Sequence, residues 1–375
     1  MLNLFYPFTL LPFYLLILSS CTERIDIYLR TSEPRLVVDG GISFDTLAHR
    51  VVLSTTMPFF SSNDDIPFVS GAHVRITEFD ENMEKTGRYF ILTEDYPDRK
   101  GHYFTDPDVF GKQRHFYRLD ISNVNIAGQT HFYALAHFPP IADRIDSIRV
   151  VWGEDLLMLM LTGRARNPYA RRTGWNVEVF ANDPPGKNYY ILVLHKNDTA
   201  LNDTLTRFML LDNQMINQTE IGLVGLPMAF ISDSSWMAVQ EGDTVTLEIR
   251  GVSADYYRFV REFWDVYGGQ NPMFGGAPAN VRGNVSGGAI GYFWAHGSRR
   301  ASDIADRSKE STMEWRDNTR EWLPRDWVWR ENTNQWTPPD WLWRENTNQW
   351  TPPDWLWCEP LGRWMPPALF SIVCR

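Results

Sequence analysis

The chain has 375 residues, of which 43% are hydrophobic and 14% aromatic, and these apolar side chains can fill the cores of about two domains of ordinary size. Its formal net charge is -10, and the acidic residues are scattered along the chain rather than gathered in a tail. Such a surface repels phosphate backbones, so nucleic acid is not an expected partner.

The N-terminal segment, residues 1–20, is apolar and has no Asp, Glu, Lys or Arg; it ends in Leu18, Ser19 and Ser20, and Cys21 follows directly. Small residues immediately before a cysteine are typical of a bacterial lipoprotein signal, in which the cysteine thiol is acylated and the preceding segment is cut away. We therefore predict a signal peptide, a lipobox made by Leu18, Ser19 and Ser20, and a lipid on Cys21. The alternative is an uncleaved N-terminal membrane helix that ends in an incidental cysteine.

The predicted lipid would hold the mature chain to one leaflet of a membrane, because each buried CH₂ of an acyl chain contributes on the order of 0.8 kcal/mol. Residues 21–34 form the predicted polar tether between the lipid and the folded body. No second apolar run of spanning length follows in the sequence, so we expect the rest of the chain to face water.

A first domain is predicted over residues 35–138, where short apolar runs are broken by turn residues about every ten positions. This pattern is typical of an antiparallel β-sandwich. In residues 72–77 three apolar side chains alternate with three polar ones, so Ala72, Val74 and Ile76 are expected in the core. The predicted strands are residues 36–38, 51–53, 72–77, 89–92, 117–121 and 132–135.

A second β-rich domain is predicted over residues 141–300, after the stiff pair Pro139 and Pro140. Its predicted strands are residues 148–152, 156–161, 175–179, 189–194, 245–249 and 290–294. One amphipathic helix interrupts them: Ser253 can cap it, and Gly268 and Gly269 end it. The apolar residues that recur at helical spacing are Tyr256, Phe259, Val260, Phe263 and Tyr267, and we expect this stripe to pack against the sheet rather than to bind a ligand.

A tryptophan-rich repeat tail occupies residues 311–375 and contains eleven of the sixteen tryptophans, spaced with a period of fourteen residues. Residues 329–342 and 343–356 are identical. Their Pro-Pro-Asp steps exclude a continuous helix, so each unit is at most a short extended arm and a turn. The indoles could form an adhesive surface for sugar rings or a protein, but the identical copies favour a recent duplication and a tail of low order.

The tail also holds Cys358 and Cys374, which are either a disulfide pair in an oxidising compartment or two unpaired thiols.

Chemical motifs are scarce, and we predict no catalytic residue, no metal site and no cofactor. The sequence lacks His-Glu-x-x-His and Cys-x-x-Cys spacings, a Gly-x-Ser-x-Gly elbow and a phosphate-binding loop. Two acidic loops, residues 63–65 and 94–98, have calcium-binding oxygens, but solvated loops are the simpler interpretation. Five Asp-Ser/Thr-aliphatic triplets resemble a signal for O-glycosylation in Bacteroidota, with Thr199 and Thr204 as the loop candidates; Asp-Thr is also a common start of a strand.

Several motifs together resemble a family of Bacteroidota outer-membrane lipoproteins, domain of unknown function 4249, over about residues 18–300. The resemblance lies in the lipobox, in residues 36–40 and 69–74, and above all in the glycine-rich stretch 284–293. The resemblance implies a first domain like the transthyretin or carboxypeptidase regulatory sandwiches and a second β-rich domain. It also implies a gene that accompanies genes of TonB-dependent transporters. It implies no catalytic residue.

The lipid anchor, the β modules and the family resemblance together predict a non-enzymatic lipoprotein that is anchored to the outer membrane, with a periplasmic or surface-exposed body. We expect it to work beside a TonB-dependent transporter, either capturing its cargo, such as a glycan or peptide, or covering its mouth. A structural or adhesive protein that uses the tryptophan repeats is the alternative. A hydrolase with two carboxylates in a cleft between the domains is a third, weaker interpretation.

Overall fold

The computed structural model describes residues 33–57, 66–139, 145–156, 173–181, 186–213, 223–232, 239–268, 281–316, 318–319, 321–359 and 362–365. The predicted signal peptide, lipobox and Cys21 lie outside these residues. No helix in the described part is long and apolar enough to cross a membrane.

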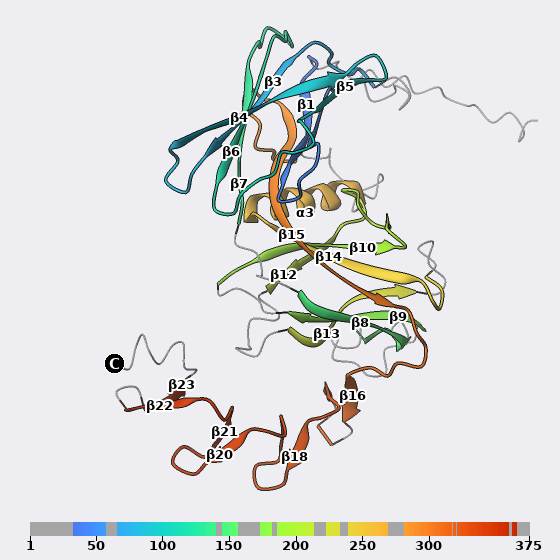
Figure 1. Ribbon diagram of the computed structural model, residues 1–375, viewed down its shortest axis with the longest axis vertical. Coiled ribbons are helices and arrows are strands. Elements are labelled where there is room, and N and C mark those ends of the chain that lie inside the picture. The colour runs from blue at the N-terminus through green and yellow to red at the C-terminus, as the bar shows by residue number, and fades with distance from the viewer. Residues whose placement is uncertain are drawn as a thin grey trace, which may run out of the picture.

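The first unit is a run of strands in the order β1-β2-β5-β4-β3-β6-β7 (Figure 1). Their bounds are β1 Leu36–Ser43, β2 Arg50–Thr55, β3 His73–Phe79, β4 Lys85–Asp95, β5 Arg99–Phe104, β6 Phe116–Ser122 and β7 Phe132–His137. Strands from both ends of this run contribute to one apolar core, so the sheet folds over on itself as a sandwich-like body. The predicted core residues Ala72, Val74 and Ile76 are all buried there, as their alternation predicted.

The second unit packs two sheets face to face. One sheet holds β10 (Tyr189–Lys196), β11 (Thr199–Ala200), β12 (Met209–Asp212) and β14 (Thr244–Val252), and the other has the order β13-β9-β8. The bounds of the second are β8 Ile145–Glu154, β9 Thr173–Ala181 and β13 Leu223–Ser232. The predicted strand at 175–179 lies within β9, and its alternate residues Trp175, Val177 and Val179 project into the shared core. Of the predicted strand at 156–161, only Leu156 lies within the described residues.

One long strand, β15 (Ile290–Ile304), belongs to both units. Residues 290–296 pair in parallel with β1, whereas residues 297–304 pair antiparallel with β14. In Figure 1 this orange strand runs from the upper strands past the helix into the lower sheet. The sequence predicted its first half as the last strand of the second domain; the pairing places that half in the sheet of the first unit.

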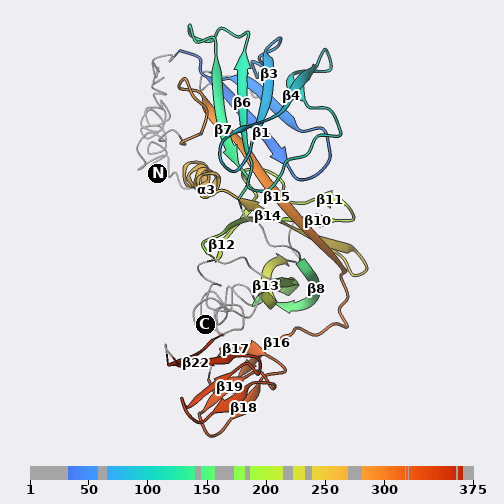
Figure 2. The same ribbon diagram turned by 60° about the vertical axis from the view of Figure 1, so that its left-hand side comes forward.

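The predicted helix is α3 (Ala254–Gly268), and the Ser253 hydroxyl accepts a hydrogen bond from the Tyr256 backbone N–H at 3.2 Å. Tyr256, Phe259 and Val260 are buried against strands of the second unit's sheet and β15, as predicted, whereas Tyr267 is 71% exposed. The aromatic stripe therefore packs on the sheet only along the first half of the helix. Figure 2 shows α3 at the level where the two units meet.

The tryptophan-rich tail forms four β-hairpins in the described part of the chain. They are β16–β17 (Met313–Arg316, Glu321–Pro324), β18–β19 (Val328–Arg330, Gln335–Thr337), β20–β21 (Leu342–Arg344, Gln349–Thr351) and β22–β23 (Leu356–Cys358, Arg363–Met365). Each hairpin pairs two tryptophans across its strands, such as Trp329 with Trp336. The sequence predicted at most one short extended arm and a turn in each repeat, and the structure has two paired strands in each hairpin.

Successive hairpins interlock, which corrects the expectation of a tail of low order. The Arg330 guanidinium lies 4.3 Å from the ring centre of Trp350 in the next hairpin, and the Trp350 indole N–H donates to the Thr333 hydroxyl at 3.1 Å. The same arginine contact recurs one unit earlier and one unit later. The contacting arginines and tryptophans each recur every fourteen residues, so each unit contacts its neighbour in the same way.

The array is attached to the second unit through a buried carboxylate. Glu178 on β9 accepts hydrogen bonds from the Ser311 hydroxyl at 2.5 Å and the Thr312 hydroxyl at 2.9 Å. In the last hairpin, Cys358 takes the place of the stacking arginine, is fully buried and forms a disulfide. Cys374 lies outside the described residues, so its pairing with Cys358 stays a prediction.

Candidate ligand-binding cleft

The two units leave a cleft of about 550 Å³ beside β15. One wall is the turn between β1 and β2, and the other is built by β10, β14, α3 and the segment after β11. The lining residues are Asp39, Gly40, Ser43, Asp45, Leu47, Ala48, His49, Arg50, Ile191, His195, Asp203, Thr204, Leu205, Phe208, Glu248, Arg250, Tyr256, Trp294, His296 and Arg300.

Glu248 on β14 is the centre of the charged floor of this cleft. Its carboxylate is buried, accepts hydrogen bonds from Arg250 Nε at 2.7 Å and Arg300 Nε at 3.2 Å, and lies 2.9 Å from His195 Nε2. Burial alone would raise the pKa of Glu248, but the hydrogen bonds of His195 and Arg250 and the nearby positive charges hold the pKa far below its usual range. Glu248 is therefore ionised at neutral pH and is not suited to donate a proton.

The ion pairs continue from Glu248 to both walls of the cleft. Arg250 Nη1 lies 2.7 Å from Asp203 Oδ1, in the second unit. Arg300 Nη2 lies 3.5 Å from Asp45 Oδ2, in the turn of the first unit. The five side chains form a continuous charged network that ties the two units together across β14 and β15.

His49 and His296 stand on the wall near β1 and β15. His49 Nε2 lies 3.1 Å from the Val109 carbonyl, and burial lowers the pKa of this ring, so it is a neutral, hydrogen-bonded side chain. His296 is only 6% exposed and stacks on Trp294 with 4.5 Å between ring centres. Burial lowers the pKa of His296 to about 3, and its Nδ1 has no hydrogen-bond partner in the described part of the protein. A buried ring nitrogen without a hydrogen-bond partner is unusual in a folded protein.

An apolar groove of about 380 Å³ opens beside the cleft, between α3, β1 and β15. The two cavities share four lining residues: Asp39, Leu205, Tyr256 and Trp294. The remaining residues of the groove are Val37, Val38, Phe259, Phe263, Val266, Val281, Ile290, Gly291 and Tyr292. Together they make one site with a polar end and an aromatic end, the usual composition of a small-molecule pocket.

The charges of the polar end are already balanced within the protein. Three guanidinium groups line it, and each lies within ion-pair distance of a lining carboxylate: Arg50 of Asp39, Arg250 of Glu248 and Asp203, and Arg300 of Glu248 and Asp45. Four carboxylates against three guanidinium groups leave a slight negative excess. A ligand with several negative charges is therefore disfavoured, and a neutral or cationic polar end is favoured.

The predicted modification sites fall in different places. Thr204 lines the cleft, so a sugar on this residue would stand at the site; Thr199 is exposed on the short strand β11. Glycosylation of both stays a prediction.

The acidic loops do not supply a cation site where they are described. The Glu94 carboxylate accepts hydrogen bonds from the Gly71 and Gly101 backbone N–H groups at 2.9 and 2.7 Å and holds two loops together. Residues 63–65 lie outside the described part. Among the described residues, no group of three His, Cys, Asp or Glu is arranged to hold a metal ion.

The sequence did not reveal this cleft, although it contained a partial signal. Residues 245–249 were predicted as a strand, and side chains alternate between the two faces of a strand, so Val245, Leu247 and Ile249 share one face and Glu248 and Arg250 the opposite one. The first unit lies beside that opposite face, which no local pattern indicates. The sequence signal that was missed lies in β15: the even-numbered residues Trp294, His296 and Arg300 share one face of that strand, and all three line the cleft.

Comparison with curated proteins found no match. The sequence model of the family described as domain of unknown function (DUF4249) matches residues 22–302, which include both β units and every lining residue of the cleft and groove, and ends before the repeat tail. The match covers most of the chain, and the protein therefore belongs to the DUF4249 family.

Proposed function

We propose that this protein is a lipid-anchored accessory lipoprotein of the outer membrane that works beside a TonB-dependent transporter and holds cargo in the cleft between its β units. The observation that supports this proposal is the two-part cavity, in which an aromatic groove continues into a polar cleft with an unpartnered buried nitrogen on His296. No step of the proposed role requires catalysis.

The chemistry of the site favours a small amphipathic cargo. The groove can bury an aromatic or aliphatic group, and the polar end offers hydrogen bonds without a free positive charge. A short peptide with an apolar side chain and a free amino group meets both conditions. A neutral sugar ring could stack on Trp294 or Tyr256 but would leave much of the apolar groove unfilled.

Titration with the neutral fluorescent probe N-phenyl-1-naphthylamine tests the cavity directly. A Cys21→Ser variant produced without residues 1–20 avoids detergent, because it has neither the apolar segment nor a thiol that can be acylated. We expect probe fluorescence to rise on binding and to be displaced by the amide of a phenylalanine–leucine dipeptide better than by its N-acetylated free acid.

Two variants of the same helix provide the matched comparison. Phe263→Ala enlarges the apolar groove and should weaken the probe about tenfold, since it removes one aromatic wall at a cost of roughly 1–2 kcal/mol of contact. Asp265→Ala, on the exposed side of the same helix and outside the groove, should leave binding unchanged. Equal affinity in all three proteins, or no binding at all, would reject the cavity as the cargo site.

The partner is tested by affinity purification of the acylated protein from detergent-solubilised outer membranes. We expect a transporter barrel to be recovered repeatedly with it. The Cys21→Ser variant should be absent from the membrane fraction and recover no barrel. Repeated isolation of the acylated lipoprotein alone would count against the transporter.

An adhesive role for the tail is the second candidate, because the hairpin array presents the same surface several times. Val328, Leu342 and Leu356 occupy equivalent positions in successive hairpins and are 40%, 45% and 43% exposed. Repetition of weak sites along one rigid element can give strong overall binding. Truncation after Asp326 keeps the first hairpin and the contacts to Glu178, and it should abolish attachment to cells or glycans if the tail is adhesive.

A further inference from the structure

The outer face of the first unit, on β4, β3, β6 and β7, has an unusual composition for a surface that meets water. Four large side chains project from it: Tyr89 is 61% exposed, Ile91 66%, Tyr133 47% and Leu135 41%. The strand register places them on both sides of a central band made by β3 and β6. Antiparallel sheets commonly have one polar face toward solvent, and this one is apolar at its two margins.

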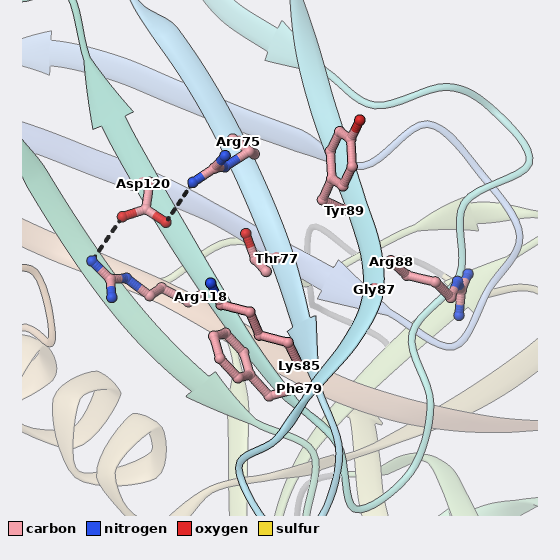
Figure 3. A pocket seen from close by; sticks show the side chains of 9 residues that line it. All are labelled: Arg75, Thr77, Phe79, Lys85, Gly87, Arg88, Tyr89, Arg118 and Asp120. Carbon is pink, nitrogen blue, oxygen red and sulfur yellow. Dashed lines mark ion pairs between the residues drawn. The ribbon is translucent and has the colours of Figure 1, made fainter.

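Arginine side chains fill the band between these margins. Arg75 and Arg118 both lie close to Asp120, with Arg75 Nη2 at 3.9 Å and Arg118 Nη2 at 2.9 Å (Figure 3). The Arg118 guanidinium also lies 4.8 Å from the ring centre of Tyr133. The shared carboxylate therefore holds two guanidinium groups in fixed positions on the sheet.

One hydrogen-bond donor of this face is left without an acceptor. Arg118 Nε is shielded from solvent and has no hydrogen-bond partner in the described part of the chain. A hollow of about 260 Å³ lies beside it, with Thr77, Phe79 and Lys85 in its lining, and Figure 3 shows Lys85 and Arg118 on neighbouring parts of that lining. A carboxylate side chain placed in this hollow would lie close to the positive charges of both Lys85 and Arg118.

The net charge of the face is opposite to that of the whole protein. Of the four cationic side chains that line the hollow, Arg88 pairs with the buried Glu78 at 2.8 Å. The other three, Arg75, Lys85 and Arg118, stand against the single negative charge of Asp120, whereas the chain carries a formal net charge of -10. Exposed tyrosine and arginine with few carboxylates is also the composition that protein interfaces favour at their centres.

We propose that this face is a docking surface for a folded protein partner whose contact patch is rich in Asp and Glu. The inference rests on the proposed function in one respect, that the protein works beside another membrane protein. The tyrosines and aliphatic side chains provide the buried area, and the arginine–aspartate band and Lys85 select the acidic patch and orient it. Because attraction between opposite charges speeds association and is screened by salt, complex formation should weaken as the salt concentration rises.

A photocrosslinker placed at Ile91 in the acylated full chain tests the docking surface in cells. We expect one dominant adduct whose attachment site, located by mass spectrometry, lies in an acidic patch of the partner. The double variant Arg75→Glu/Lys85→Glu should lower adduct yield at least tenfold. Lys187→Glu/Arg258→Glu, which makes the same charge change outside the face and both cavities, should retain the yield.

Exchanging the charges between the two proteins tests whether the crosslinked adduct depends on recognition of the partner's acidic residues. Replacing the acidic residues at the partner's attachment site by Arg should restore the adduct with Arg75→Glu/Lys85→Glu. Absence of any adduct, an adduct that charge reversal leaves unchanged, or an adduct that disappears on glycosidase treatment would overturn the proposal. Probe titration of the double variant should match the wild type, so failure of the docking surface is distinguishable from failure of the cleft.

Discussion

At the scale of single residues, Glu248 is the side chain on which the cleft depends most. It is buried, and its carboxylate is held by Arg250 and Arg300 from two strands and lies against His195 from a third. Removing one partner of a buried ion pair leaves the others with uncompensated charge, which costs more than the pair itself contributes. The residue is therefore structural, and its substitution should act on stability before it acts on binding.

Glu248→Gln should lower the free energy of unfolding by roughly 3–5 kcal/mol at pH 7, because two guanidinium groups lose their shared carboxylate. Chemical denaturation measures this loss. Glu241→Gln, a surface substitution, should change stability by less than about 0.5 kcal/mol.

The pH dependence of the same variant has a defined sign. The pKa of Glu248 is lower in the folded protein than in the unfolded chain, so its contribution is present above the unfolded value and is lost as the pH falls below it. The difference between wild type and Glu248→Gln should therefore shrink as the pH falls below about 4. A difference that stays constant down to pH 3 would show that the carboxylate charge is not what stabilises the fold.

At the scale of elements, local patterns were predictable and partners distant in the sequence were not. The alternation of Val74 and Ile76 and the helical spacing of Tyr256, Phe259 and Val260 each correspond to a buried face. Such patterns depend only on neighbours within one strand or helix. The division of β15 between two sheets depends on β1, which lies about 250 positions earlier, and no local pattern records that pairing.

In the repeat tail, too, the contacts between different units could not be predicted from local sequence patterns. Its period and its extended arms could be seen in the sequence, but the fit of Arg330 on Trp350 could not, because it joins two different units. The identity between copies was therefore interpreted as a sign of recent duplication and low order, although repeated units also fit an ordered array. Asn334 and Asn348 support the ordered array, since both adopt the left-handed backbone conformation in the same position of successive hairpins, with φ of 54° and 51°.

Removal of one whole repeat tests the array. Deleting residues 343–356 should preserve cooperative thermal unfolding in the near-ultraviolet circular dichroism of the tryptophan pairs, because Arg330 then meets Trp364 in the position of Trp350. Deleting residues 343–349 removes half a unit and should abolish that signal for the last hairpins. Equal behaviour of the two deletions would contradict interlocking of the hairpins.

At the scale of the whole molecule, the arrangement separates three surfaces. The cleft and groove lie where the two β units meet, and the proposed docking surface lies on β4, β3, β6 and β7 of the first unit. The hairpin array extends from the second unit (Figures 1 and 2). The family match covers the first two surfaces and ends before the third. The two proposed binding surfaces therefore lie within the part of the chain that the family model matches, and the hairpin array lies outside it.

Hydrogen–deuterium exchange of the Cys21→Ser protein, with and without N-phenyl-1-naphthylamine, tests the central claim most directly. The account predicts slower exchange in β1, in α3 and in the first half of β15, which form the groove and one wall of the cleft, and no change in the hairpins from residue 328 onward. Protection confined to the hairpins, with the cleft unaffected, would contradict it and would favour the tail as the binding element.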